Sequence, residues 1–296
     1  MTIKKTLVVF NPLPQRARQR RVQALCDALE QAKRPYVLVA TDADITVTAT
    51  SINTYIAQAS ELIVVGGDGT LHQVVNALGE GYKGLEVGYI PAGTGNDFAR
   101  GWFGKQLNTL EYIERALHGK AVCIDIGQVN DRYFINSVGV GFDGDLTLRL
   151  AGKKSWWPKL TYLIYALKQL FIYRGQTITM EGSDPSLEHI DSRPTLLFVA
   201  ANMRYFGAGM LIAPHAKPTS GELAWLQVQE CRLAVKLWSF SSIYKGTHLA
   251  KSVVTSGQLG FVDISTAQIP MQADGECVGH TPARIRCVGQ VLSVRL

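Results

Sequence analysis

Two glycine-rich stretches, each placed directly after a short apolar run, constrain the fold of this chain more than any other feature. Residues 66–70 (GGDGT) follow the apolar run 62–65, and residues 91–97 (PAGTGND) follow the run 87–90. A strand, a glycine turn and a helix N-terminus together present backbone N–H groups to an anion, because glycine permits tight turns and close approach. We therefore predict a nucleotide-phosphate site here. The helix after the first stretch shows amphipathic spacing at Leu71, Val74, Val75 and Leu78.

The first 90 residues alternate between apolar runs and helical patterns. Runs 7–10 and 36–40 read as strands, like the two runs that precede the glycine stretches. This β-α-β-α-β-α-β order predicts a parallel sheet covered by helices, with ligands bound at the carboxyl ends of the strands. The helical faces are expected at Val22, Leu25, Cys26 and Leu29, and at Ile52, Tyr55, Ile56 and Ala59.

The pattern changes after about residue 120, where short runs rich in β-branched and aromatic residues alternate with turn residues. We expect strands over 122–129, 133–138, 177–180, 195–201, 223–228, 260–264 and 284–288, with helices over 160–171 and 233–244. The predicted fold class is thus α/β plus all-β. An N-terminal parallel-sheet domain (1–125) precedes an antiparallel β-sandwich domain (126–296), whose last strand is allowed to return to the first domain.

The net charge and the cysteine content limit which partners and which cellular compartment are expected. The net charge of +6 favours an anionic partner, which nucleotide, nucleic acid or a membrane surface would each satisfy. Five scattered cysteines without a Cys-x-x-Cys pair fit a reducing compartment, and no apolar stretch is long enough to span a bilayer. We expect a cytoplasmic protein. A basic run at Arg16, Arg18, Arg20 and Arg21 is interpreted as a solvated helix face rather than a phosphate contact.

The polar residues within the glycine stretches allow two interpretations each. Asp68 lies among amides that would hold phosphates, so it implies a divalent cation between the charges, or else it caps the following helix. Thr70 and Thr94 could donate to phosphate oxygens or cap helices, and Asn96 and Asp97 pose the same choice. Neither stretch matches a P-loop or the Gly-x-Gly-x-x-Gly fingerprint.

Together these residues carry a resemblance to a known family. The sequence GGDGTL followed by VVNAL, and then IPAGTGNDFAR, resembles the diacylglycerol kinase catalytic family, with sphingosine kinases more distant. The first motif is shared with NAD kinases and phosphofructokinases, whereas the second is more specific to lipid kinases. The similarity continues in order through residues 125–127, 134–136, 139–143, 206–210, 212–214, 244–248 and 274–276.

The resemblance implies an ATP-dependent kinase that uses Mg²⁺ and takes a lipid substrate between its two domains, and it implies no nucleic acid partner. Asp274 matches the residue assigned as catalytic base, with Glu276 beside it, and Asp68, Asp97 and Asp125 match a magnesium-linked network. From the residues alone, 273–276 favours a type I′ hairpin turn instead. The implied nucleotide contacts are Asn11, Thr41, Gly66, Gly67, Asp68, Gly69, Thr70, Gly93, Thr94, Asn96 and Asp97.

The chain departs from the family pattern at two places. The turn usually written Asn-Pro-x-Ser-Gly is Asn11-Pro12-Leu13-Pro14-Gln15, which puts that nucleotide contact in doubt and leaves the arginines beyond it to compensate. The second-domain metal site, expected at Lys217, Ser220 and Glu222, has serine where bacterial members have aspartate. A neutral hydroxyl is a poor replacement for a carboxylate on a hard cation.

Residues 155–174 form an aromatic, partly basic segment that suits transient peripheral membrane contact, or packing into the second domain. A homodimer is kept as a hypothesis. The leading expectation is a lipid kinase acting on a lipid such as diacylglycerol or phosphatidylglycerol. A NAD kinase-like enzyme acting on a soluble metabolite and an inactive module that binds nucleotide or membrane are the alternatives.

Overall fold

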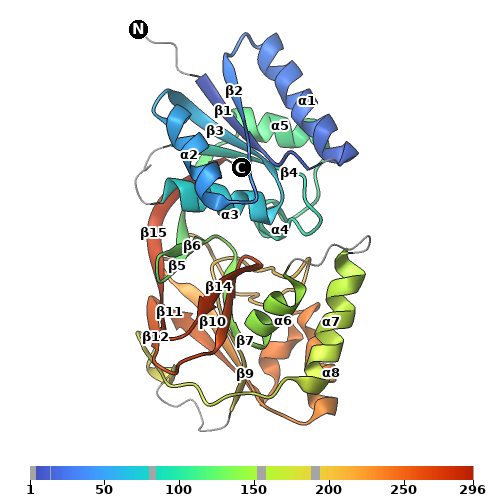
Figure 1. Ribbon diagram of the computed structural model, residues 1–296, viewed down its shortest axis with the longest axis vertical. Helices are drawn as coiled ribbons and strands as arrows, with labels where there is room; N and C mark the ends of the chain where they lie inside the picture. The colour runs from blue at the N-terminus through green and yellow to red at the C-terminus, as the bar shows by residue number, and fades with distance from the viewer. Residues whose placement is uncertain (1–4, 14, 80–84, 152–157, 188–193, 296) are drawn as a thin grey trace. The chain divides into compact units, whose positions relative to one another are not determined.

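The computed structural model describes residues 5–13, 15–79, 85–151, 158–187 and 194–295 (Figure 1). The chain forms two compact units. Unit 1 comprises Met1–Ile124 with Gln290–Leu296, and unit 2 comprises Asp125–Gly289. Among the described residues, no helix is both long enough and apolar enough to cross a bilayer.

Unit 1 is built on a parallel sheet, as the sequence predicts. The end of the last strand completes it, because Ser293 and Val294 pair in parallel with Glu86 and Val87. The strand order is β2 (Tyr36–Ala40), β1 (Lys5–Phe10), β3 (Ala59–Gly66), β4 (Glu86–Pro91) and then β15 (Ala283–Arg295).

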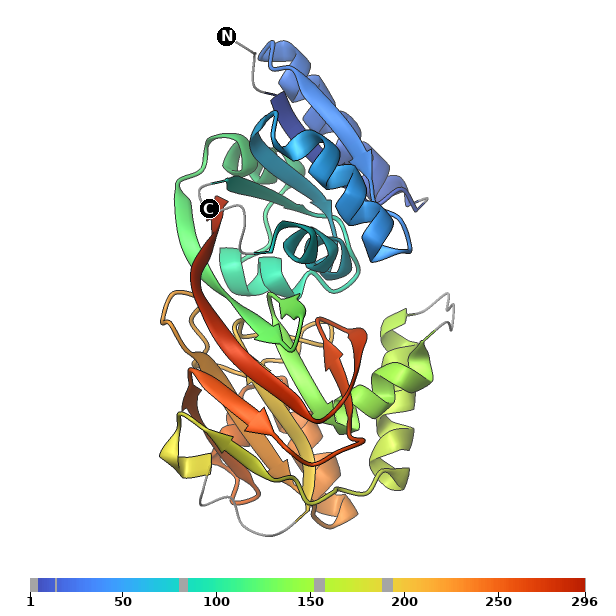
Figure 2. The same ribbon diagram turned by 60° about the vertical axis from the view of Figure 1, so that its left-hand side comes forward.

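Helices cover both faces of this sheet (Figures 1 and 2). Helices α1 (Arg16–Gln31) and α5 (Thr109–His118) share one core with the strands. On the opposite face, α2 (Ile45–Ile56) and α3 (Asp68–Leu78) contact each other, and α4 (Asp97–Phe103) follows β4. The expected apolar face of α1 is confirmed, since Leu25 and Leu29 are fully buried. The expectation for Ala59 is wrong because α2 ends at Ile56 and Ala59 begins β3.

Unit 2 is a β-sandwich with an added helical layer. In the core between its two sheets, Phe198 stacks on Trp225, with ring centroids 6.0 Å apart. Its described antiparallel sheet runs β11 (Val254–Leu259), β10 (Leu223–Gln229), β9 (Thr195–Ala201), β7 (Ser137–Gly141), β13 (Pro270–Ala273), β14 (Glu276–His280). The facing strands are β5 (Ala121–Val129), β6 (Arg132–Phe134), β8 (Met180–Gly182), β12 (Phe261–Ile264) and the first part of β15.

The outer face of the antiparallel sheet is covered by three helices, α6 (Phe142–Leu150), α7 (Pro158–Ile172) and α8 (Leu233–Ile243) (Figure 1). Because strand side chains alternate between faces, Phe198 points into the sandwich while Leu197 and Val199 pack against these helices. Short 3₁₀ turns lie at Pro185–Leu187 and Thr247–Ala250.

Three details of the predicted second half are corrected. The strand expected over 133–138 is two strands, β6 and β7, because the amides of Ile135 and Asn136 donate to the Asp274 carboxylate and so leave the ladder. The strand expected over 177–180 begins only at Met180. Helix α6 and strand β11 lie outside the predicted elements, whereas β13 and β14 flank the hairpin turn predicted at 273–276.

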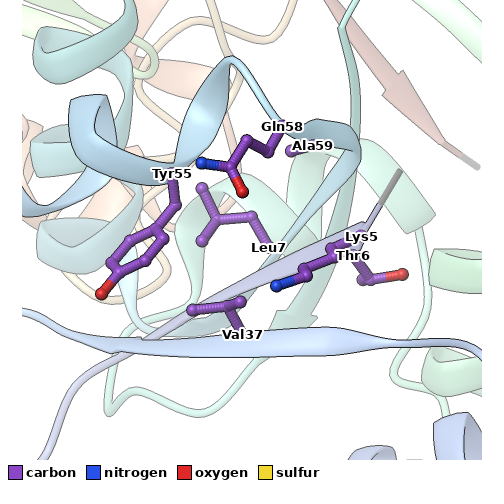
Figure 3. Close-up of a pocket in the computed structure, with 7 residues that line it drawn as sticks. All are labelled: Lys5, Thr6, Leu7, Val37, Tyr55, Gln58 and Ala59. Atoms are coloured by element: carbon purple, nitrogen blue, oxygen red, sulfur yellow. The ribbon is translucent and has the colours of Figure 1, made fainter. Parts of the chain in front are cut away.

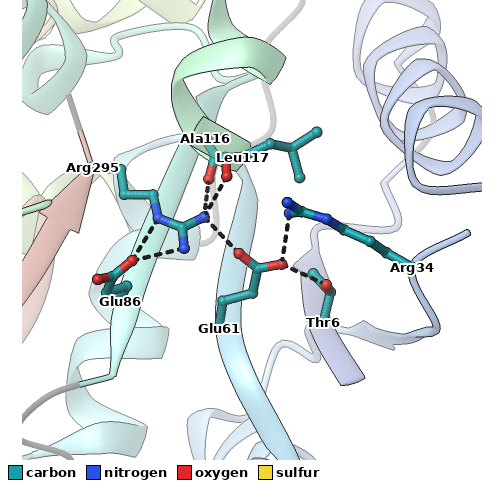
Figure 4. A network of polar contacts seen from close by, with 7 residues as sticks. All are labelled: Thr6, Arg34, Glu61, Glu86, Ala116, Leu117 and Arg295. Atoms are coloured by element: carbon teal, nitrogen blue, oxygen red, sulfur yellow. Dashed lines mark hydrogen bonds and ion pairs between the residues drawn. The ribbon is translucent and has the colours of Figure 1, made fainter. Parts of the chain in front are cut away.

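The penultimate residue, Arg295, ties the end of β15 into unit 1 (Figure 4). Its guanidinium forms ion pairs with Glu61 at 2.5 Å and Glu86 at 2.7 Å. It also donates to the carbonyls of Ala116 and Leu117 at 2.8 and 3.0 Å, at the end of α5. The same Glu61 accepts from Arg34, so β3, β4, β15 and α5 meet at one charged cluster.

Candidate functional site

The two glycine stretches lie against each other where β3 and β4 end. The Gly66 carbonyl accepts from the Ala92 amide at 2.7 Å and from the Tyr89 hydroxyl at 3.1 Å. A Cβ on Gly67 would lie 2.9 Å from the Cα of Gly93, and a Cβ on Gly93 only 2.4 Å from the Cα of Gly67. These two glycines are therefore required for the contact between the loops, in addition to any approach by a ligand.

Asp68 is the first residue of α3, and its carboxylate caps a different helix, α4. Its carboxylate accepts from the amides of Asp97 at 3.1 Å and Phe98 at 3.0 Å, which open α4. A negative charge at a helix N-terminus is stabilised by the partial positive charge of the unpaired amides there. Asp68 thus fixes the start of α4 relative to the first glycine loop, and Asp97 is buried at that point.

Asn96 closes the second glycine loop on itself. Its side chain accepts from the Gly93 amide at 2.8 Å and donates to the Gly93 carbonyl at 2.9 Å. Its backbone is left-handed, with φ of 53°, a conformation that asparagine tolerates better than most residues. Thr70 is buried under Gly66, and Thr94 is exposed.

Several amides of the two loops point to no protein acceptor. The N–H groups of Gly69, Thr94 and Gly95 form no hydrogen bond with any part of the chain that the structure describes. Such donors, at the start of α3 and before α4, are suited to phosphate oxygens. Asn11 and Thr41, predicted as nucleotide contacts, follow β1 and β2 at the same edge of the sheet, where the Thr41 amide donates to the Phe10 carbonyl.

The basic run in α1 is a solvated face only in part. Arg16 and Arg20 are exposed, as expected, and Arg21 lies over the Tyr112 ring with its guanidinium carbon 5.8 Å from the centroid. The interpretation is wrong for Arg18, which is 9% exposed and bonded into the loops. At the opposite edge of the sheet, a cavity of about 10 Å³ is lined by Lys5, Leu7 and Tyr55 among others (Figure 3). That volume is about enough for one water molecule.

In unit 2, the predicted hairpin turn at 273–276 is confirmed. Asp274 and Gly275 have φ of 51° and 88°, both positive as type I′ requires, and Ala273 pairs with Glu276. The turn also aims the Asp274 carboxylate at a neighbouring loop. It accepts from the amides of Ile135 at 2.9 Å, Asn136 at 2.8 Å and Ser137 at 3.2 Å. Glu276 is exposed at the start of β14.

A second carboxyl group in unit 2, Asp143, was not assigned a role from the sequence. It lies in the first turn of α6 and is 5% exposed. It accepts from the Gln272 side-chain amide, whose oxygen accepts from the Gly275 amide at 2.7 Å. Burial raises the pKa of Asp143 to about 7. Its position within the quoted segment 139–143 was the only signal in the sequence.

Asp143 lines a cavity of about 50 Å³ between the antiparallel sheet and the helical layer. The walls are predominantly apolar, and the polar exceptions beside Asp143 are Lys236, Ser239 and His248. The Lys236 ammonium is paired with Glu230 at 2.6 Å. The remaining lining residues are Phe142, Leu170, Leu196, Leu197, Phe206, Met210, Val228, Phe240, Ile243 and Val254.

The raised pKa of Asp143 predicts a specific pH dependence of stability. Because the folded state holds this proton more tightly than the unfolded state, the stabilisation is complete below about pH 4 and is lost as pH rises through about 7. Asp143→Asn should remove a slope of up to about 1.4 kcal/mol per pH unit in this window. Denaturant unfolding of both proteins between pH 4 and 8 measures it, and identical slopes would contradict the prediction. His248 titrates in both proteins, so its opposite contribution cancels in the difference.

The expected second-domain metal site does not fit a cation. The Ser220 hydroxyl lies 2.8 Å from the Lys217 carbonyl and 3.0 Å from the Glu222 carbonyl, so it bridges the oxygens that would face the ion. Asp125 is fully buried and accepts from the Gly221 amide at 2.7 Å. No group of three His, Cys, Asp or Glu side chains among the described residues could hold a metal.

We predict that this loop is stable without a metal. The unfolding temperature of the nucleotide-free protein should be the same in 5 mM EDTA and in Mg²⁺, to within about 1 °C by the usual scaling of stability with temperature. Ser220→Asp, which introduces a carboxylate among the same carbonyls, should make the unfolding temperature rise with Mg²⁺. A Mg²⁺-dependent shift in the unsubstituted chain would overturn this expectation.

Comparison with known proteins places this arrangement in a family. Residues 5–129 match the diacylglycerol kinase catalytic domain, and residues 136–296 match the YegS C-terminal NAD kinase beta sandwich-like domain. A Bacillus subtilis protein named "Putative lipid kinase YtlR" is 30% identical over 239 residues, covering 76% of each chain. The chain belongs to the bacterial diacylglycerol kinase-like lipid kinase family.

Further members of this lipid kinase family extend the similarity. A diacylglycerol kinase of Staphylococcus carnosus is 29% identical over 238 residues, which cover 79% of this chain and 75% of that protein. In structure, a diacylglycerol kinase from Bacillus anthracis superposes with a TM-score of 0.71 at 16% identity, covering 100% of this chain and 97% of the other. The likeness in structure shows that the fold of both units is the family's fold.

Proposed function

We propose that this chain transfers the γ-phosphoryl group of ATP to a hydroxyl of a membrane lipid such as diacylglycerol or phosphatidylglycerol. The observation that carries the lipid part is the cavity of unit 2, whose walls are predominantly apolar and include one buried carboxyl group, Asp143. The apolar lining suits the end of an acyl chain better than a soluble, charged acceptor, and the volume of about 50 Å³ takes only a short stretch of such a chain. The family membership supports a kinase.

The nucleotide half of the proposal rests on unit 1. The N–H groups of Gly69, Thr94 and Gly95, which form no hydrogen bond with the described residues, are available as donors for phosphate oxygens. Bound Mg²⁺ would neutralise charge on the phosphates, and Asp68 is the residue that would hold it, since its carboxylate lies in the first glycine loop at the start of α4. One carboxylate is enough for an ion held mainly by phosphates.

Asp274 is the proposed general base. In the reaction, the lipid hydroxyl oxygen bonds to the γ-phosphorus as the bond from that phosphorus to the bridging oxygen of ADP breaks, and the hydroxyl proton passes to a carboxylate. Three amide hydrogen bonds fix the orientation of the Asp274 carboxylate. Gln272 links the turn to Asp143 through the Gly275 amide, so both carboxyl groups belong to one polar chain in unit 2.

Peripheral membrane contact through α7 and α8 is part of the proposal. On α7, the exposed side chains Leu160, Ile164, Lys168, Phe171 and Ile172 recur at helical spacing along one stripe. On α8 and just beyond it, Trp238 is 64% exposed and Tyr244 is 50% exposed. Aromatic side chains with nearby lysines suit the headgroup level of a bilayer. Residues 155–157 of the proposed contact segment lie outside the described residues.

Product identification tests the function directly. The protein is incubated with ATP, Mg²⁺ and a total lipid extract, and the lipids are analysed by mass spectrometry for a mass gain of one phosphate. A phosphorylated lipid supports the proposal. Phosphorylation of a soluble dinucleotide without lipid would replace it with the NAD kinase-like alternative, and ATP binding without any product would indicate an inactive module.

A matched pair of variants tests the cavity. Ser239→Phe places a ring in the cavity, whereas Ser241→Phe places the same ring on the exposed face of α8. The first should lower lipid phosphorylation and leave ATP affinity unchanged, and the second should change neither. Equal activities for two folded variants would show that the cavity does not receive the substrate.

A further inference from the structure

Arg18 occupies an unusual place among the charged side chains of unit 1. It lies in the first turn of α1, yet it is buried between the loop after β1 and the loop after β4. Its Nη1 donates to the Asn11 side-chain oxygen at 3.0 Å and to the Leu13 carbonyl at 3.1 Å. Its Nε donates to the Ala92 carbonyl at 3.3 Å. One guanidinium therefore joins two of the loops at the carboxyl edge of the sheet.

The guanidinium of Arg18 has no carboxylate partner among the residues that the structure describes. All three acceptors are neutral, and within the described part of the chain no carboxylate pairs with Arg18. Burial lowers the pKa of Arg18 through desolvation. A desolvated cation costs free energy unless an anion completes its environment. The other terminal nitrogen, Nη2, forms no hydrogen bond with the described residues.

The surroundings of Arg18 show which anion is expected. Ala92, its acceptor, directly precedes the loop whose Thr94 and Gly95 amides are available as donors. The turn after β1 offers few donors of its own, because Pro12 and Pro14 have no N–H and the Leu13 amide is taken by the Asn11 side chain at 2.9 Å. A phosphate at this edge would accept hydrogen bonds from backbone amides of the loop after β4. From the turn after β1 it would be left with a side-chain donor, Arg18.

We propose that Arg18 is a phosphate-contacting residue of the nucleotide site, donating from Nη2 to a phosphate oxygen in place of the amides that the proline-rich turn lacks. This inference rests on the nucleotide half of the proposed function and not on the lipid half. The contacts with Asn11 and Leu13 would hold the guanidinium in a fixed orientation for this role. Arginine suits this role because its planar donors match phosphate geometry.

Calorimetric titration without lipid tests the proposal. Arg18→Gln should weaken Mg²⁺–ATP binding by about 10- to 100-fold, the size expected for a lost charge-assisted hydrogen bond, and leave adenosine binding within about twofold. Arg18→Lys, which keeps the charge, should recover part of the ATP affinity. The matched controls Arg16→Gln and Arg20→Gln remove exposed charges of the same helix and should change ATP affinity by less than about threefold.

The competing explanation is that Arg18 has only a structural role, in which it holds the loop after β1 and the loop after β4 together. In that case Arg18→Gln would weaken ATP and adenosine equally, and an unchanged ratio would overturn the proposal. If Arg18→Gln is too unstable for calorimetry, Arg18→Lys takes its place. The rise in unfolding temperature caused by inorganic triphosphate with Mg²⁺ is then measured for Arg18→Lys and for the unsubstituted chain. Equal stabilisation of both, or no ATP binding by the unsubstituted chain, also overturns it. If ATP binding depends on Arg18 but no lipid is phosphorylated, the proposed lipid substrate is refuted and the role of Arg18 in nucleotide binding is supported.

Discussion

Asp274→Asn is expected to lower lipid phosphorylation by about 10²- to 10⁴-fold, the usual contribution of a general base, while Mg²⁺–ATP affinity stays within about twofold. A carboxylate can take up the hydroxyl proton, whereas the neutral amide of asparagine is too weak a base to do so. Steady-state rates with the identified lipid, together with calorimetry for ATP, measure both quantities. Activity within about tenfold of the unsubstituted chain would remove Asp274 from the role of base.

The same substitution also disturbs structure, so it needs a structural control. The carboxylate accepts from the amides of residues 135–137, and the amide side chain of asparagine at this position could not accept from all three. Thermal unfolding of the variant separates the two effects, since loss of the base lowers turnover without requiring a large drop in unfolding temperature. Asp131→Asn, in the exposed turn between β5 and β6, is the matched control and should alter neither property.

Arg295→Ala is expected to reduce the free energy of unfolding by about 3–5 kcal/mol, because it removes the nearer of the two arginines paired with the buried Glu61 and leaves only Arg34, at 3.4 Å. It also releases the carbonyls at the end of α5 and the attachment of β15 to β4. Denaturant unfolding measures the loss, and amide hydrogen exchange at the end of α5 should rise with it. Arg284 provides a matched control on the same strand.

The control isolates burial as the cause. Arg284 is 58% exposed and pairs with Asp263 at 3.5 Å, so Arg284→Ala should cost less than about 1 kcal/mol. A loss at Arg295 no greater than at Arg284 would contradict the role of the cluster. Glu61→Gln combined with Arg295→Met, which removes both charges, should recover part of the stability because it leaves no buried charge uncompensated.

Features set by neighbours in the sequence could be predicted. The parallel sheet of unit 1 follows from apolar runs alternating with amphipathic helices, and β9 and α8 were placed within a residue or so. The turn at Asp274 and Gly275 is a local choice as well, since both residues tolerate positive φ. Backbone preference and side-chain periodicity act within a few residues of the chain, so one sequence is enough to reveal them.

Only the tertiary structure decided which side chains meet. Asp68 caps a helix 29 residues later, Arg18 bonds to a carbonyl 74 residues away, and Asp274 bonds to amides more than 130 residues away. Each of these partners lies on another element, and nothing in local periodicity specifies it. The sequence alone determined the strands, turns and glycine loops, because these depend on local conformation. The hydrogen bonds that orient the charged groups depend on packing between distant elements, and therefore required the folded chain.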